Sequence, residues 1–515
     1  MSSQVTTGSV LVAGTTSDAG KSVLTAGICR WLARQGVRVA PFKAQNMSNN
    51  SVVAPDGAEI GRAQAMQAAA CGVPAEAAMN PVLLKPGSDL TSQVVLLGRA
   101  VGDTTAGGYW GAGAGRQRLF ATVLDAYDDL RSRFDVVVCE GAGSPAEINL
   151  RRGDMANMGL ARARGLPVVV VGDIDRGGVF AALYGTLALL EPADQALISG
   201  FVINKFRGDQ SLLTPGLAEL TARTGRPVLG VVPYLTRTWI DAEDAVATEG
   251  RYGPEDAACS DRSMQVAVIR LPHISNFTDV DALALEPGVC VRFVSSPTSL
   301  GDADLVILPG TKATVADLAW LRARGLDRAL ARRAADGCPI LGICGGYQML
   351  GTVICDDVES RAGTVAGLGL LPIETRFAAE KTLRLPSGYA GQLAVAGYEI
   401  HHGAVEVRDS APWFTSGPGG EGAALDGCRA GAVSGTLWHG IFENDAFRRS
   451  YLAETASMAG CDFVPAVGSC FAAARQAQFD ELAEAIDASL DAAALLHLIE
   501  TGPARDLPVL PSGPC

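Results

Sequence analysis

Cys344 is the first candidate for chemistry, because it stands in CPILGICGGYQML (338–350), where an apolar strand pattern changes to a helical one. Gly342, Gly345 and Gly346 leave room for a sharp strand-to-helix turn, which presents a side chain at the helix N-terminus. The positive end of the helix dipole lowers the pKa of a thiol there and favours the reactive thiolate. The segment therefore predicts a nucleophilic cysteine, whereas the other cysteines fit buried structural thiols.

A thiol nucleophile needs a general base and hydrogen-bond donors for an oxyanion, and the sequence offers candidates for both. His439 follows a predicted strand in GTLWHGIF and is the predicted base. The backbone N–H groups of Gly345 and Gly346 can form half of an oxyanion hole, and Gly310 in LPGTK can supply the other half. Glu443, four residues after His439, is the nearest carboxylate along the chain, which leaves a third member of the site open.

The chain has five histidines, and the other four carry weaker signals. His401 and His402 in YEIHHG can line a site, but we interpret them as solvent-facing or turn residues. His273 follows a strand and can face the boundary between two domains, and His497 fits a structural position in a C-terminal helix. With no CxxC pair and so few histidines, a zinc site is not expected.

A second candidate site begins where an apolar strand at 9–14 runs straight into the glycine-rich segment GTTSDAGKS (14–22), which a helical pattern follows. Backbone N–H groups and the helix dipole converge at such a turn, which suits a phosphate. Lys21 adds a charge for the β- and γ-phosphates, and the Ser22 hydroxyl is placed to bind Mg²⁺. The alternative is an ordinary glycine-rich turn. The loop encloses five residues between its first and last glycines, where the standard phosphate loop encloses four.

Two later strand ends support a nucleotide site. Glu140 ends the strand in DVVVCEGAG, and an acid there, facing the phosphate loop, is predicted to bind Mg²⁺ together with Ser22. The alternative is a loop carboxylate that caps the next helix. Asn204 ends the strand ISGFVINK, where its amide can read the edge of a purine base, although asparagine at a strand end is usually turn chemistry. The predicted ATP-binding residues are Gly14, Thr15, Thr16, Asp18, Ala19, Gly20, Lys21, Ser22 and Asn204.

Composition limits the class of protein. The chain has 515 residues, of which 48% are hydrophobic and 19% charged, and this excludes a disordered chain and requires more than one domain. A net charge of −13 argues against nucleic-acid binding. No apolar run approaches the ~20 residues of a membrane-spanning helix, and the N-terminus lacks the basic region of a signal peptide. We therefore expect a cytoplasmic protein without a nucleic-acid or membrane partner, whose oligomeric state stays open.

Strand and helix patterns alternate in two blocks, which predicts an α/β fold with two doubly wound, mostly parallel sheets and a helical C-terminal tail. The predicted domains are 1–240 and 264–470, with an acidic linker at 241–263 and the tail at 471–515. The strands of the first block are predicted at 9–14, 37–43, 135–141, 166–173, 198–205 and 227–233. Those of the second block are expected in 264–277, 303–310 and 338–346, and in VCVRFVS, VAGYEIHHG and AVSGTLWHGIF.

These motifs resemble two known families joined in one chain. GICGGYQ with a downstream strand-end histidine resembles the class I glutamine amidotransferases, and this resemblance adds Gln348 to the expected glutamine-binding residues. GTTSDAGKS with EGAG resembles the dethiobiotin synthetase-like branch of phosphate-loop enzymes, which shares the five-residue spacing. The fusion resembles the cobyrinic and cobyric acid synthase group. The stretches that match the cobyric acid synthases within it are PFKAQNMSNN, EIGRAQAMQA, NPVLLKPGSD, EGAGSPAEINL, DIDRGGVFAALYGTLALLEP and GFVINKFRGD.

The resemblance implies an ATP- and glutamine-dependent amide synthase with ATP and Mg²⁺ as cofactors. Its expected substrates are L-glutamine and adenosylcobyrinic acid a,c-diamide, of which four corrin carboxylates become amides to give adenosylcobyric acid on the route to cobalamin. Residues 1–240 are then the ATP-dependent synthetase domain and 264–470 the amidotransferase domain. Two alternatives remain: cobyrinic acid a,c-diamide synthase, or a non-amidating phosphate-loop ATPase with an inactive amidotransferase domain.

Overall fold

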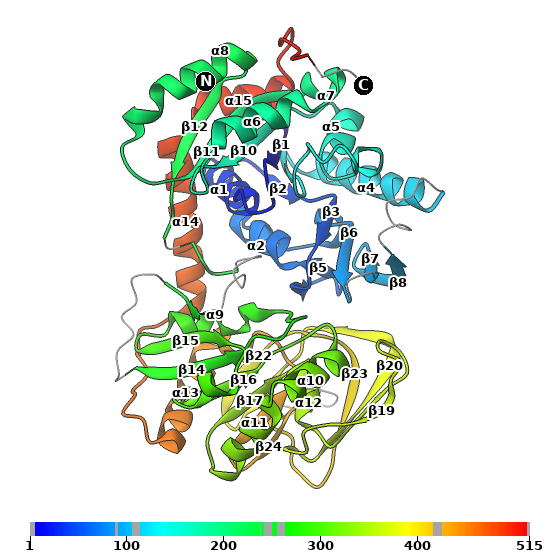
Figure 1. Cartoon of the computed structure of the whole chain (residues 1–515), viewed down its shortest axis with the longest axis vertical. Helices are drawn as coiled ribbons and strands as arrows, with labels where there is room; N and C mark the ends of the chain where they lie inside the picture. The colour runs from blue at the N-terminus through cyan, green and yellow to red at the C-terminus, as the bar shows by residue number, and fades with distance from the viewer. Residues whose placement is uncertain are drawn as a thin grey trace.

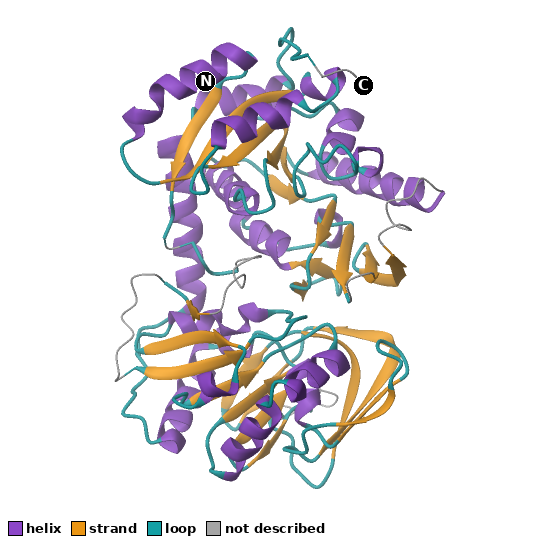
Figure 2. Cartoon of the chain, in the orientation of Figure 1, coloured by secondary structure: helices purple, strands orange, loops and turns teal. Residues whose placement is uncertain are grey.

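The computed structural model describes residues 6–87, 91–105, 114–236, 238–241, 250–254, 263–415 and 425–511. The chain forms two α/β bodies that lie one above the other along the long axis, and both ends of the chain lie in the upper one (Figure 1). Strands and helices are mixed in both bodies (Figure 2). Among the described residues, no helix is long and apolar enough to cross a membrane.

The first body, uppermost in Figure 1, is built on a six-stranded parallel sheet with the strand order β12-β11-β10-β1-β9-β2. The strands are β1 (Gly8–Gly14), β2 (Val39–Phe42), β9 (Val136–Glu140), β10 (Val168–Asp173), β11 (Ile198–Phe206) and β12 (Val228–Pro233). Each matches a predicted strand, because continuous valine and isoleucine runs mark strands buried on both faces. The helices are α1 (Lys21–Arg34), α4 (Ala114–Arg133), α5 (Met158–Arg164), α6 (Val179–Ala188), α7 (Pro192–Gln195) and α8 (Thr214–Thr224).

Between β2 and β9 the chain leaves this sheet and forms an insertion, residues 43–105, on the side of the second body (Figure 1). It contains the sheet β3-β6-β7-β8, the pair β4-β5 and helix α2 (Arg62–Cys71). Its strands are β3 (Gln45–Met47), β4 (Ser51–Val53), β5 (Glu59–Gly61), β6 (Val82–Pro86), β7 (Thr91–Leu96) and β8 (Arg99–Thr105). Runs this short carry little periodic signal, and the sequence analysis did not predict them.

The second body is built on a seven-stranded sheet with the order β13-β15-β14-β16-β17-β25-β24. Its inner strands are parallel and its two edge strands antiparallel. The strands are β13 (Gly250–Tyr252), β14 (Met264–Ile269), β15 (Val289–Val294), β16 (Leu305–Leu308), β17 (Ile340–Ile343), β24 (Cys428–Ala430) and β25 (Val433–Thr436). The helices are α9 (Asp281–Leu285), α10 (Thr314–Ala323), α11 (Leu326–Ala335), α12 (Gly345–Leu350) and α13 (Asp445–Ala459).

One strand of the second body is not where we expected it. We placed VAGYEIHHG in the main strand–helix alternation, but β23 (Glu399–Val407) lies in a separate sheet with the order β19-β18-β20-β23. There it pairs antiparallel with the twelve-residue β20 (Ile373–Arg384), and antiparallel neighbours need no intervening helix. The remaining strands are β18 (Val353–Asp356), β19 (Gly363–Ala366), β21 (Ser387–Ala390) and β22 (Leu393–Ala396).

The junction and the tail tie the bodies together. In the predicted linker, Asp241 is buried and β13 joins the second sheet, while residues 242–249 and 255–262 lie outside the described residues. The tail forms α14 (Phe471–Ser489) and α15 (Ala492–Thr501), and α14 runs alongside both bodies (Figure 1). Ile486 packs into the first body with Leu24 of α1. A Cβ on Gly27 would lie 2.8 Å from Ile486 Cγ1, so this glycine lets α1 and α14 approach closely.

Candidate active sites

Cys344 lies at the sharp turn between β17 and α12. Its backbone has φ 51° and ψ −110°, a conformation that a non-glycine residue adopts at a cost of about 1–3 kcal/mol and that clusters at functional sites. The neighbouring glycines make the turn possible: a Cβ on Gly346 would lie 1.9 Å from the Leu308 carbonyl oxygen, and one on Gly342 would lie 2.8 Å from the Tyr347 nitrogen. The sequence thus builds the tight turn that the glycine pattern predicted.

The imidazole of His439 is held on two sides. Its Nδ1 lies 2.7 Å from Asp279 Oδ2, and Asp279 Oδ1 accepts the Gly440 N–H at 2.8 Å. The ring stacks on Tyr398 with 5.1 Å between centroids and 20° between planes. With Nδ1 engaged by the carboxylate, Nε2 is the ring nitrogen left for the Cys344 thiol. A cysteine, a histidine and an orienting carboxylate therefore meet at the carboxyl edge of the second sheet.

Asp279 was not predicted from the sequence as part of the site. It lies in a short 3₁₀ turn, η4 (Phe277–Val280), at a separation of 160 residues from His439. Glu443, the carboxylate that is nearest along the chain, instead lies 3.1 Å from Arg475 Nη2. The available signal was the position of η4 after β14, because the loops that follow neighbouring parallel strands meet at one edge of the sheet.

The charge on His439 follows from these neighbours. Burial lowers the pKa of the ring, but the charges of Asp279 and Cys344 outweigh it and raise the pKa to about 10. We expect glutaminase activity to fall along a basic limb near pH 10, where the imidazolium loses the proton that a departing ammonia needs. Steady-state rates between pH 6 and 11, with circular dichroism to verify folding, would check this. A basic limb near pH 7 would contradict it.

Two of the residues expected to hold glutamine, Gly345 and Gln348, line a cavity beside the thiol. This cavity is lined by Cys344, Gly345, Gln348, Ser275, Thr311, Lys312, His401 and His402, among others. Gln348 is buried, with its amide nitrogen 3.4 Å from the Gly403 oxygen. A Cβ on Gly310 would lie 3.0 Å from His439 Cε1, so the predicted oxyanion loop closely approaches the base.

Our interpretation of His401 and His402 as solvent-facing or turn residues was wrong. Both lie on β23 and line the cavity beside Cys344. His402 Nδ1 lies 3.1 Å from the Ala378 oxygen, and its Nε2 lies 3.3 Å from Gln93 of the first body. Burial lowers the pKa of His401 to about 4, which keeps that imidazole neutral at physiological pH. The interpretation failed because these residues belong to a strand, β23, whose side chains line the same cavity as the thiol.

The phosphate loop lies between β1 and α1 as predicted. Lys21 Nζ donates to the carbonyl oxygens of Thr16 and Ser17 at 2.8 and 3.0 Å, so the side chain folds back over the loop. Gly20 has φ 92°, and a Cβ there would lie 2.2 Å from Asn204 Nδ2. Asn204 Nδ2 donates to the Ala19 oxygen at 3.0 Å. Asn204 therefore supports the loop from behind, and glycine is required at the point of contact.

The two predicted Mg²⁺ ligands lie together beside this loop. Ser22 Oγ donates to Glu140 Oε1 at 2.7 Å, and Lys43 Nζ and Gln67 Nε2 donate to the same buried carboxylate at 2.8 and 2.5 Å. Although burial raises the pKa of Glu140, the Lys43 charge holds it below its usual value. A hydroxyl and an ionised carboxylate fit Mg²⁺, which binds few protein oxygens and completes its shell with phosphate and water.

A cavity of about 320 Å³ opens in front of these residues. Lys21, Ser22, Lys43 and Glu140 line one side, and the segment from Ala142 to Asn157 contributes to the rest. Across the described residues, no group of three histidine, cysteine or acidic side chains gathers to hold a metal ion. The first body thus brings together a glycine-rich loop, Lys21 and the pair of Ser22 and Glu140, and the second brings together a thiol, an imidazole and a carboxylate.

Comparisons with known proteins agree with both halves. Residues 10–245 match the model of the CobQ/CobB/MinD/ParA nucleotide binding domain, and residues 265–447 match the CobB/CobQ-like glutamine amidotransferase domain. The chain is 59% identical to a cobyric acid synthase of Streptomyces coelicolor, over 98% of this chain and 99% of that protein. Cobyric acid synthases of Frankia casuarinae and Mycobacterium marinum are 58% and 56% identical, each over 98% of this chain and 99% of the relative.

The two folds and their matches define a glutamine-dependent amide-forming ligase with a nucleotide-binding domain. Within that class, the chain belongs to the family of cobyric acid synthases. The family and the fold class predicted from the motifs are confirmed.

Proposed function

We propose that this chain converts adenosylcobyrinic acid a,c-diamide to adenosylcobyric acid by amidating four corrin carboxylates with ammonia from glutamine, at the expense of ATP. The observation that carries the proposal is the match to cobyric acid synthases over nearly the full length of the chain, and the residues gathered at the two candidate sites support it. We assign the chain to the cytoplasm, because Cys29, Cys71 and Cys139 are free thiols as in a reducing compartment, although Cys290 is disulfide-bonded.

Glutamine is hydrolysed in the second body. Cys344, as the thiolate that remains once its proton has passed to His439, attacks the side-chain amide carbon, and Asp279 orients the imidazolium. Backbone N–H groups at Gly310 and Gly345 stabilise the tetrahedral oxyanion. His439 then protonates the nitrogen that leaves as ammonia, and a thioester remains. Water hydrolyses the thioester to glutamate and restores the thiol.

The carboxylate is activated in the first body. The backbone of the phosphate loop and Lys21 hold the β- and γ-phosphates of ATP, and the corrin carboxylate takes the γ-phosphoryl group in line. Ser22 and Glu140 would hold Mg²⁺, which supplies charge neutralisation at the phosphates when bound. Ammonia attacks the acyl phosphate, the C–N bond forms and phosphate leaves. Lys43 lies within reach of this cavity and is placed to stabilise negative charge there.

The products of a single reaction test this assignment. The purified chain with adenosylcobyrinic acid a,c-diamide, glutamine, ATP and Mg²⁺ should give a product whose mass reflects four amidations. Mass loss of about 1 Da per carboxylate converted to amide is resolved by high-resolution mass spectrometry. In a parallel reaction with cobyrinic acid in place of the a,c-diamide, amidation of cobyrinic acid, together with no conversion of the a,c-diamide, would show the a,c-diamide synthase instead. ATP hydrolysis without any amidation would support the inactive-amidotransferase alternative.

Replacement of Lys21 by alanine should reduce amide synthesis by at least about tenfold with either glutamine or ammonia as nitrogen donor, because the β- and γ-phosphates lose their point charge. Glutaminase activity should survive at least in part, since Cys344 and His439 lie in the other body. Nucleotide binding by calorimetry and basal glutaminase should be measured on the same preparation. Unchanged ATP-dependent turnover would show that this loop is not the phosphate site.

A further inference from the structure

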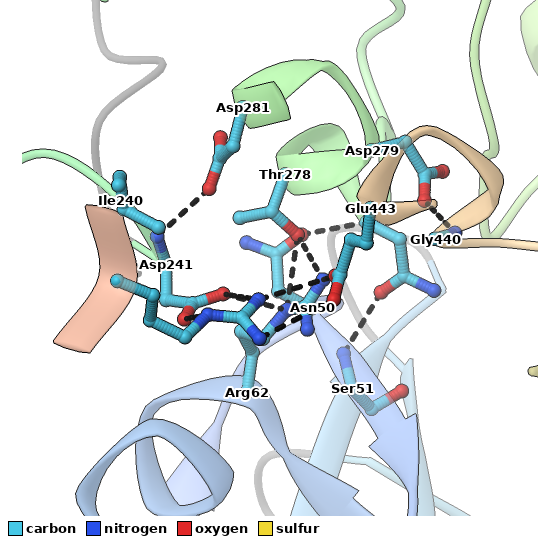
Figure 3. Close-up of polar contacts among 12 residues, drawn as sticks. Asn50, Ser51, Arg62, Ile240, Asp241, Thr278, Asp279, Asp281, Gly440 and Glu443 are labelled. Atoms are coloured by element: carbon cyan, nitrogen blue, oxygen red, sulfur yellow. Dashed lines mark hydrogen bonds and ion pairs between the residues drawn. The ribbon is translucent and has the colours of Figure 1, made fainter. Parts of the chain in front are cut away.

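The turn that carries Asp279 lies at the boundary between the two bodies. η4 (Phe277–Val280) belongs to the second body, and Asp279 points from it toward Gly440 (Figure 3), whose N–H it accepts, and contacts Nδ1 of His439. Its other side faces the insertion of the first body, where Asn50, Ser51 and Arg62 lie (Figure 3). Asp279, the acid next to His439, therefore lies in a short 3₁₀ turn, and residues of the first body contact the side of this turn that faces away from His439.

Two sets of hydrogen bonds cross this boundary. The guanidinium of Arg62 donates from Nε and Nη2 to Thr278 Oγ1 at 3.0 and 2.8 Å. Asn276 N–H donates to Asn50 Oδ1 at 2.7 Å, and Asn276 Oδ1 accepts the Ser51 N–H at 2.9 Å. The first body thus holds the residue directly before Asp279 and the residue three before it.

Arg62 also lies against the second support of the base. Its guanidinium carbon is 5.8 Å from the centroid of the Tyr398 ring, which stacks on His439. Ion pairs fix the guanidinium in turn, with Asp241 at 3.6 Å and Glu443 at 3.8 Å. The side chain is only 8% exposed, so these contacts are made away from solvent, where charge-assisted hydrogen bonds are strong.

Helix α2 gives Arg62 a rigid base. Arg62 is the first residue of α2, and Gln67, further along the same helix, donates to Glu140 at 2.5 Å. Glu140 belongs to the central sheet of the first body. The guanidinium is therefore anchored through α2 to the sheet of one body while it holds a turn of the other.

We propose that Arg62 is a positioning residue for glutamine hydrolysis, which acts across the boundary by fixing Thr278 and so holding Asp279 in line with His439. The inference rests on the proposed function of Cys344 and His439. An ordinary interface contact would be needed for the bodies to stay together but not for the orientation of the imidazole. The two roles predict different responses to loss of the single acceptor on Thr278.

Thr278→Val removes that acceptor at nearly constant volume and leaves the ion pairs of Arg62 in place. We expect glutaminase kcat to fall about tenfold, as for other residues that orient a catalytic ligand through a hydrogen bond. Thr278→Ser, which keeps the hydroxyl, should restore most of the rate. Arg62→Met should lower glutaminase kcat about 10²-fold, the effect expected when a catalytic group is displaced by about 1 Å. In both impaired variants the basic limb of the pH profile should move to lower pH. Asp279 is then no longer aligned with the imidazole, so it raises the pKa of His439 less.

The full-length enzyme and a matched control make the test decisive. Arg30→Met removes a partly exposed arginine contact far from the thiol along the chain, to Asp480 at 2.9 Å between α1 and α14, and should leave glutaminase unchanged. Ammonia-dependent synthesis should stay near wild type in Thr278→Val. A Thr278→Val enzyme with wild-type kcat and pH profile would overturn the proposal, as would equal loss with glutamine and ammonia in both variants. If the wild-type enzyme released no glutamate from glutamine, the proposed function itself would fail.

Discussion

Replacement of Cys344 by alanine should abolish glutamine-dependent amide synthesis and leave ammonia-dependent synthesis substantially intact. The thiol sits on a strained turn in the second body and can only liberate ammonia there, whereas the phosphate loop and Glu140 lie in the first body. Removal of a nucleophile costs the whole covalent route rather than a fraction of it. Amide formation measured with glutamine and with ammonium chloride at pH 8.5, on one preparation, separates the two activities.

Cys338→Ala is the matched control for this experiment. Cys338 is a free thiol in the same segment. It precedes β17, whereas Cys344 follows it, so its loss should change neither activity. A Cys344→Ala enzyme that is folded, as judged by thermal melting, yet loses synthesis equally with both nitrogen donors would refute this division of labour. Retention of glutamine-dependent synthesis would show that another group is the nucleophile.

The parts of both sites that a single segment encodes were predictable. A glycine-rich loop after a valine run places Lys21 and Ser22 by local geometry, and the same holds for Cys344 between its glycines. Parallel strands meet at one edge, so the proximity of Glu140 to Ser22 also followed from their strand-end positions. In each case the pattern, the turn and the residue type agree within one short stretch of chain.

The parts that depend on pairing between distant segments were not predictable in this way. Asp279 lies in a short 3₁₀ turn, and Asp281 follows two residues later. The sequence does not show which of these two acids contacts His439. His401 and His402 were misassigned because the antiparallel pairing of β23 with β20 has no local signature. The contact of Arg62 with Thr278 joins residues separated by 216 positions and by the boundary between the bodies.

Asp279→Asn should reduce glutaminase kcat by about 10⁴-fold, the cost of losing the acid that orients a catalytic imidazole. The carboxylate accepts from Nδ1 of His439 at 2.7 Å, and an amide there offers a donor in place of one acceptor, so the ring takes the wrong tautomer or rotates. Glu443→Gln should cost on the order of tenfold or less, since Glu443 pairs with arginines rather than with the base. Steady-state glutaminase rates for the two variants, side by side, measure the difference.

Asp281→Asn provides the same substitution two residues further on. Burial, together with the charge of Asp241, raises the pKa of Asp281 to about 8, so this carboxyl group is already largely protonated at pH 7 and asparagine changes its charge little. The Tyr252 hydroxyl donates to Asp281 Oδ1 and the Asp241 N–H donates to Oδ2, so the amide of asparagine keeps an acceptor for one of these two donors, and neither donor belongs to the pair of His439 and Asp279. Its glutaminase rate should therefore remain near wild type. If Glu443→Gln were as inactive as Asp279→Asn, or if Asp279→Asn were as active as Asp281→Asn, Asp279 would not be the acid that orients His439.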